Sequence, residues 1–151
     1  MPDRVDLYRL FIAAPSDVLA ERDIVYQLVA DWNAINSRFF GLAFEAVTWL
    51  THSVPEDGAR AQEILNRELV MTSDALVAIF WTRLGSPTGD SASGTVEEIE
   101  RFRETGRPLA LYFSDAPIPP SSVDEEQLSA VRAYRDNAFE NGLRGTYEGV
   151  S

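Results

Sequence analysis

The sequence of 151 residues has no cysteine and only one histidine, His52. Without cysteine there is no disulfide framework, no thiolate nucleophile and no zinc–sulfur site. A single histidine cannot form a histidine-rich metal centre, and because His52 lies in a polar loop, surface placement is a simpler interpretation than general-base work. We therefore expect no metal site.

Basic residues are few beside acidic ones. The chain has 13 Lys and Arg against 24 Asp and Glu, which gives a formal net charge of −11. This charge repels a phosphate backbone, so we expect no nucleic-acid partner. No apolar run approaches the roughly 20 residues that a membrane-spanning helix needs, and the amino terminus lacks the order of a signal peptide. We expect no membrane span and a cytoplasmic location.

Two nucleotide-binding motifs are also missing. No Gly-x-Gly-x-x-Gly follows the first apolar run, and the chain has no P-loop lysine pattern. These absences leave kinase, NTPase and classical dehydrogenase functions without support.

Short apolar runs alternate with helical periods along the whole chain. With 45% hydrophobic residues and no interior linker, the length fits one domain spanning residues 1–151. The patterns predict strands at 7–14, 43–49, 75–81, 107–113 and 144–147, and helices at 17–36, 59–71, 95–106 and 123–140. Helical spacing predicts that these side chains face inward: Val18, Val25, Leu28, Trp32, Ile35, Ile64, Leu65, Leu69, Leu128, Val131, Tyr134 and Ala138.

Strict alternation of strands and helices implies an α/β fold with a parallel sheet and helices on both faces. Five short strands predict a flavodoxin-like, three-layer sandwich. The run at 75–81 is the most apolar and is expected at the sheet centre, whereas Glu45 indicates an edge strand. The loops at 14–17, 49–58 and 81–94 would then line a crevice at the carboxyl ends of the strands.

Glu98 is the candidate catalytic residue. At about 100° per residue, Val96, Ile99 and Phe102 define an apolar arc, and Glu98 lies at its border. Glu97 falls on the solvated face. A carboxylate that looks into a half-dry crevice could attack a sugar carbon or stabilise an oxocarbenium-like centre.

A structural explanation of Glu98 stands beside the catalytic one. Thr95-Val96-Glu97-Glu98 matches a capping box, and spacing alone favours that interpretation. Trp49 and Trp81 could stack on a base or complete the core. Arg83 could pair with a phosphate or be a solvated charge, and Ser16 with Asp17 could present a helix amino terminus to an anion or simply cap the helix.

Several segments together resemble a known family. They are Phe11 to Val18, Trp49, Asp74 to Gly89, Ser93 to Glu98, Gly106-Arg107-Pro108 and Tyr112-Phe113. They look like the TIR-like domains of a bacterial family of unknown function. The Ser-Gly-Thr-x-x-Glu pattern at 93–98 also resembles that of nucleoside 2-deoxyribosyltransferases, in which the matching glutamate is the nucleophile. The TIR signature of serine, tryptophan and cysteine before the glutamate is absent.

The resemblance implies a TIR-like NAD⁺ glycohydrolase effector, with Glu98 catalytic, Glu97 as the fallback and NAD⁺ as substrate rather than cofactor. It further implies homotypic assembly, a lid at 50–58, a fused sensor or regulatory domain after an amino-terminal effector, and a role in antiphage defence. The substrate-binding residues expected are Ala14, Pro15, Ser16, Trp49, Trp81, Arg83, Ser93, Gly94 and Thr95. A deoxyribosyltransferase-like N-glycosidase and a non-catalytic TIR-type interaction module remain as alternatives.

Overall fold

The computed structural model describes residues 1–49, 56–85, 94–139 and 144–147 and shows an α/β fold. The strands are β1 (Asp6–Ala13), β2 (Leu42–Val47), β3 (Ala75–Phe80), β4 (Leu109–Ser114) and β5 (Arg144–Tyr147). The helices are α1 (Leu19–Phe40), α2 (Glu56–Met71), α3 (Gly94–Glu104) and α4 (Glu125–Phe139), with 3-10 turns η1 (Ser16–Val18) and η2 (Pro120–Ser122). Within these ranges, no helix combines the length and apolar character that crossing a bilayer would require.

The strands form one parallel sheet in the order β2-β1-β3-β4-β5. This order is typical of flavodoxin-like sheets, in which the winding reverses between β1 and β3 and leaves a crevice at their carboxyl ends. The expected parallel sheet flanked by helices is confirmed. So are the central position of β3 and the edge position of β2, the strand that carries Glu45.

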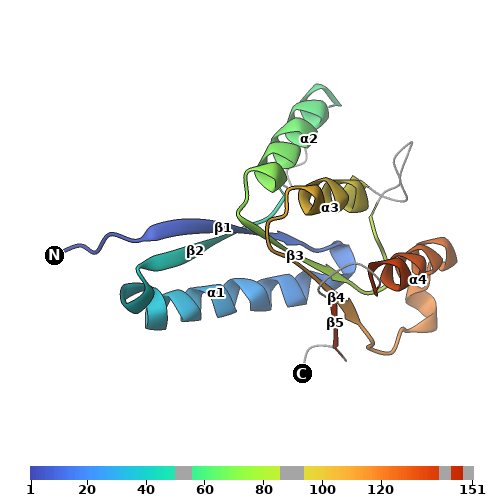
Figure 1. Ribbon diagram of the computed structural model, residues 1–151. Helices are drawn as coiled ribbons and strands as arrows, with labels where there is room; N and C mark the ends of the chain where they lie inside the picture. The colour runs from blue at the N-terminus through green and yellow to red at the C-terminus, as the bar shows by residue number, and fades with distance from the viewer. Residues whose placement is uncertain (50–55, 86–93, 140–143, 148–151) are drawn as a thin grey trace.

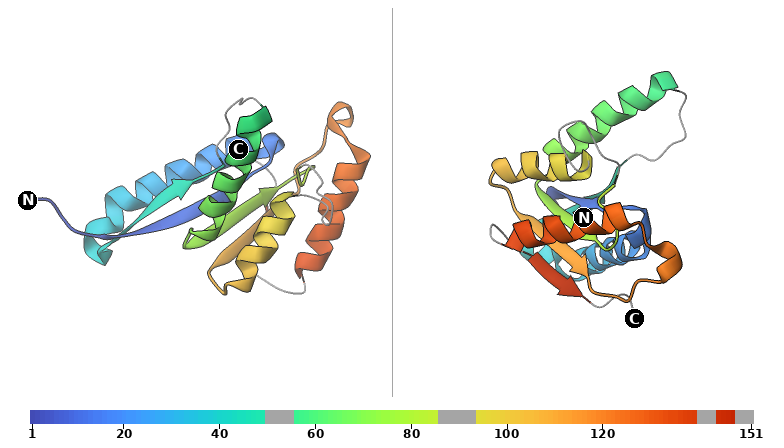
Figure 2. Two further views of the ribbon diagram at one scale, coloured as in Figure 1. Left: turned by 90° about the horizontal axis from the view of Figure 1, so that it is seen from above. Right: turned by 90° about the vertical axis from the view of Figure 1, so that its right-hand side faces the viewer.

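Helices cover both faces of the sheet (Figure 1). Helix α1 lies on one face, and α2, α3 and α4 lie on the other (Figure 2). Neighbouring strand residues point to opposite faces, so Phe11 joins the larger core with Phe80 and Phe102, while Ile12 joins the smaller core with Val18. The larger core therefore ties α3 to the sheet and fixes the helix that carries Glu98.

Helix α1 differs from its prediction in length and in some of the side chains that face the sheet. It continues past Asn36 to Phe40 and ends at Gly41, whose φ of 68° is the left-handed conformation that glycine favours. Leu28 and Ile35, predicted to face inward, are 60% and 71% exposed. Val18 and Val25, also predicted to face inward, do pack in the smaller core. The prediction is therefore confirmed near the start of the helix and wrong at Leu28 and Ile35.

Helix α2 begins at Glu56, three residues before the predicted start. Ile64 and Leu65 were expected to face inward but are half-exposed, while Val70 is buried near the end of the helix. Figures 1 and 2 show α2 running away from the sheet toward its amino-terminal end. Packing on the sheet is therefore concentrated at the carboxyl end of this helix.

Candidate active site

The indole of Trp49 holds the carboxylate of Glu98. Trp49 Nε1–H donates a hydrogen bond of 3.2 Å to Glu98 Oε2, across 49 residues of sequence. Trp49 lies two residues beyond the end of β2, and Glu98 lies in the second turn of α3. The Trp49 ring also meets Phe11 edge to face, with ring centroids 5.3 Å apart. A core aromatic thus positions the indole, and the indole positions the carboxylate.

The neighbouring carboxylate has a different environment. Glu97 Oε1 accepts a 2.7 Å hydrogen bond from Arg101 Nη2, one helical turn further on. Such an i,i+4 pair is typical of a helix surface. Of the two adjacent glutamates, Glu98 therefore bonds to Trp49 in the segment after β2, whereas Glu97 pairs along its own helix.

The start of α3 bears on the capping-box interpretation. The helix begins at Gly94, so Thr95 is its second residue and not the residue before it. A capping box places its hydroxyl residue directly before the first helical residue, so the predicted position of Thr95 is wrong by two residues. The helix extends further toward its amino terminus than the box assumes. Ser93 lies outside the described residues.

The first loop is organised differently from its prediction. Ala14 is buried, Pro15 precedes η1, and Ser16 is exposed with no side-chain cap at the start of η1. Asp17, predicted as a cap, reaches Thr82 instead. Its Oδ2 accepts 2.9 Å and 2.6 Å hydrogen bonds from the Thr82 backbone N–H and hydroxyl. The prediction that Asp17 caps the helix is wrong, because its carboxylate binds Thr82 and so links the loops after β1 and β3.

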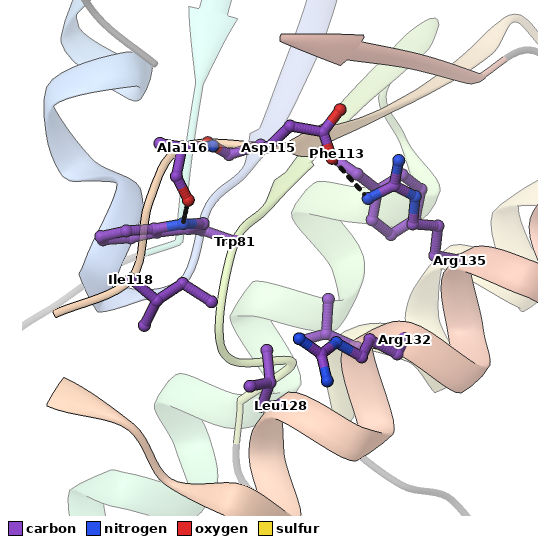
Figure 3. Close-up of a pocket in the computed structure, with 10 residues that line it drawn as sticks. Trp81, Phe113, Asp115, Ala116, Ile118, Leu128, Arg132 and Arg135 are labelled. Carbon is purple, nitrogen blue, oxygen red and sulfur yellow. Dashed lines mark hydrogen bonds and ion pairs between the residues drawn. The ribbon is translucent and has the colours of Figure 1, made fainter. Parts of the chain in front are cut away.

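Trp81 lies away from the pair formed by Trp49 and Glu98. It packs on the smaller core, whereas Trp49 packs on the larger one. Its Nε1–H donates a 3.1 Å hydrogen bond to the carbonyl of Ala116. Trp81 also lines a pocket beside Arg132 and Arg135 of α4, neither of which the sequence interpretation singled out (Figure 3). The i,i+3 spacing of these arginines, which places them on one side of a helix, was the feature of the sequence that could have indicated a shared basic site.

Of the remaining predicted residues, some are described by the structure and others lie outside the described ranges. Arg83 is exposed after Thr82, and Gly94 opens α3. The proposed lid lies outside the described residues at 50–55, together with His52, and continues as the start of α2. The crevice segment 86–93 also lies outside them. In the described part of the chain, no group of three or more His, Cys, Asp or Glu side chains could hold a metal ion.

The chain resembles one described domain family and several solved structures. The model of a domain of unknown function, DUF4062, matches residues 9–150. No curated protein matches the chain. The solved structures with similar folds include a 2-deoxyribosyltransferase from Bacillus psychrosaccharolyticus, with 13% identity, a TM-score of 0.49 and coverage of 89% of this chain and 91% of that one.

A conserved protein from Enterococcus faecalis V583 has 17% identity and a TM-score of 0.49, with coverage of 95% of this chain and 92% of that one. The family match agrees with the resemblance to a bacterial domain of unknown function. A relationship to TIR domains stays a prediction.

Proposed function

The chain belongs to the DUF4062 family of domains of unknown function, and from that premise we propose an enzyme that cleaves the N-glycosidic bond of a nucleoside or nucleotide. Glu98 is its catalytic carboxylate. One observation carries the proposal: the 3.2 Å hydrogen bond that Trp49 donates to Glu98 at the carboxyl edge of the sheet. Parallel α/β sheets bind ligands at this edge.

The chemistry follows from what a fixed carboxylate can do at a sugar carbon. As the bond between C1′ and the base nitrogen breaks, its electron pair leaves with the base. The Glu98 carboxylate attacks C1′ or stabilises the oxocarbenium-like centre. Water, or a second base in a transfer reaction, then bonds to C1′ and releases the glutamate unchanged.

Trp49 is a positioning residue in this mechanism. Its indole is held by Phe11 and restricts where Oε2 of Glu98 can lie. A reacting carboxylate that is already oriented avoids part of the entropic cost of reaching an attack geometry. The half-buried indole also offers an aromatic surface beside the carboxylate on which a base could pack.

Two substrate classes fit this chemistry. One is NAD⁺, whose nicotinamide–ribose bond would be cleaved by a TIR-like effector that is activated by homotypic assembly. The other is a deoxynucleoside, whose deoxyribosyl group would pass to water or to another base. Both use the same carboxylate and differ in the sugar and in the leaving base.

Incubation of the full chain with each substrate class tests the proposal. The protein, at high concentration, is given NAD⁺ in one reaction and a deoxynucleoside with a second free base in another, and chromatography follows base release. We expect turnover of one class. Glu98→Gln should reduce it to the uncatalysed rate, because the amide is a poor nucleophile and carries no charge.

Glu97→Gln is the matched control, since Glu97 pairs with Arg101 on the helix surface. It should keep turnover near that of the unchanged protein. Equal activity of the two variants would overturn the role of Glu98. No base release in either reaction would contradict the proposal and would favour a non-catalytic interaction domain.

A further inference from the structure

A cavity lies where the carboxyl ends of β3 and β4 meet α4. Its volume is about 380 Å³, and its lining includes neither Glu98 nor Trp49. This volume falls within the range of about 300–1,000 Å³ that is common for small-molecule sites. The cavity is therefore large enough for a small organic ligand and is separate from the pair that carries the proposed function.

One wall of this cavity is aromatic and aliphatic. Trp81 lies in it with Ile118 close by, while Leu128 lies across the cavity on α4, one turn before Arg132 (Figure 3). The hydrogen bond from Trp81 Nε1–H to the Ala116 carbonyl holds the indole in place and satisfies its one polar group. The rest of the ring is then available for packing against a flat apolar group.

The opposite wall is charged. Arg132 and Arg135 project from one side of α4, three residues apart. Arg135 Nη1 pairs with Asp115 Oδ1 at 2.7 Å, which fixes its guanidinium and neutralises its charge. Arg132 is exposed and has no hydrogen bond or ion pair with another described residue. The three charged side chains leave a local charge of +1 in a chain whose net charge is −11.

We propose that this cavity binds a small aromatic oxyanion, with its flat ring against Trp81 and its carboxylate or phosphate at Arg132. A guanidinium offers a planar fork of donors that matches either oxyanion in two hydrogen bonds. Apolar groups around the indole favour a ring over a purely polar ligand. No bond is made or broken in this cavity, so the inference is independent of the activity proposed for Glu98.

Calorimetric titration of the full chain tests the inference and separates the two sources of oxyanion. The probes are adenosine 5′-monophosphate, a phosphate, and indole-3-acetate, a carboxylate. Adenosine and inorganic phosphate each supply one half of the predicted ligand. At least one aromatic oxyanion should bind about tenfold more tightly than adenosine and inorganic phosphate, because only it engages both walls.

Variants locate the binding. Arg132→Gln should weaken it by about tenfold or more, the effect of losing a hydrogen bond to a charged group. Arg132→Lys keeps the charge and loses the planar fork of donors, so its affinity should lie between that of the unchanged protein and that of Arg132→Gln. Arg67→Gln is the matched control, since Arg67 is an exposed arginine of α2 outside the cavity. Glu98→Gln should also leave binding unchanged, which distinguishes this cavity from the proposed active site.

Four results would overturn the inference. The first three are no binding of either aromatic oxyanion at millimolar concentration, equal affinity of Arg132→Gln and Arg67→Gln, and binding of adenosine or inorganic phosphate as tight as that of the aromatic oxyanions. Loss of binding in Glu98→Gln, with Arg132→Gln unaffected, would assign the ligand to the proposed active site and would also overturn it.

Discussion

Asp17 and Thr82 join two loops that are 65 residues apart in sequence. One carboxylate oxygen of Asp17 accepts both the backbone N–H and the hydroxyl of Thr82, at 2.9 Å and 2.6 Å. Thr82 is 3% exposed, so water competes little for these groups. The contact fixes the loops after β1 and β3, the two strands between which the winding of the sheet reverses.

Loss of the contact between Asp17 and Thr82 should lower the free energy of unfolding, and the effects of substituting the two residues should be coupled. Asp17→Ala should lower the free energy of unfolding by about 2 kcal/mol, because it removes a charged acceptor and leaves a buried N–H unpaired. Thr82→Val should cost less, since it keeps the backbone donor. In a double-mutant cycle by urea denaturation we expect a coupling energy of about 1 kcal/mol. Additive effects of the two changes would contradict the role of this contact.

Trp49→Phe separates the hydrogen bond to Glu98 from the packing around it. The phenyl ring can keep the edge-to-face contact with Phe11 but cannot donate to the carboxylate. If Glu98 is catalytic, base release should fall by about tenfold or more, the effect of losing a hydrogen bond to a charged group. A fall in kcat with little change in the urea midpoint would support positioning. A fall in stability with unchanged kcat would show that Trp49 only packs the core.

The features that the sequence predicted correctly are those carried by local patterns. Alternating strands and helices imply a parallel sheet, and the apolar run from Ala75 to Phe80 could only belong near its centre. The helical angle of Glu98 depends on its neighbours within α3 alone. That is why its direction, away from Glu97, could be predicted before any contact was known.

The features that were missed depend on tertiary contacts. Asp17 has the local pattern of a helix cap, and nothing near it in sequence indicates Thr82. Arg132 and Trp81 are 51 positions apart, and only the packing of α4 beside β3 and β4 brings them to one cavity. On α1, hydrophobic spacing assigned both Val25 and Leu28 to the inward side, and only the packing of the helix on the sheet shows that Val25 is covered while Leu28 is exposed.

Substitutions on α1 and α3 should show the difference in stability between losing an exposed and losing a buried apolar side chain. Ile35 is 71% exposed and Phe102 is 0% exposed. Ile35→Ser should change the free energy of unfolding by less than about 0.5 kcal/mol, as is usual for surface positions. Phe102→Ala should cost about 3–5 kcal/mol, because it leaves a cavity in the larger core. Thermal or urea denaturation measures both. A large loss in Ile35→Ser would mean that this side of α1 is covered in solution.

Tyr134 should make stability fall at alkaline pH. Burial, and then the nearby Glu100 carboxylate, raise the pKa of Tyr134 well above its usual value, and its hydroxyl donates a 3.3 Å hydrogen bond to Glu100. Its contribution is thus fully present below about pH 10 and is lost at higher pH, where the unfolded tyrosine ionises first. Between about pH 9 and pH 11, the stability of the unchanged protein should fall by about 1.4 kcal/mol relative to Tyr134→Phe. Urea denaturation at each pH measures this difference. Tyr112→Phe, at an exposed tyrosine, is the control, and an equal pH effect in both variants would contradict the assignment.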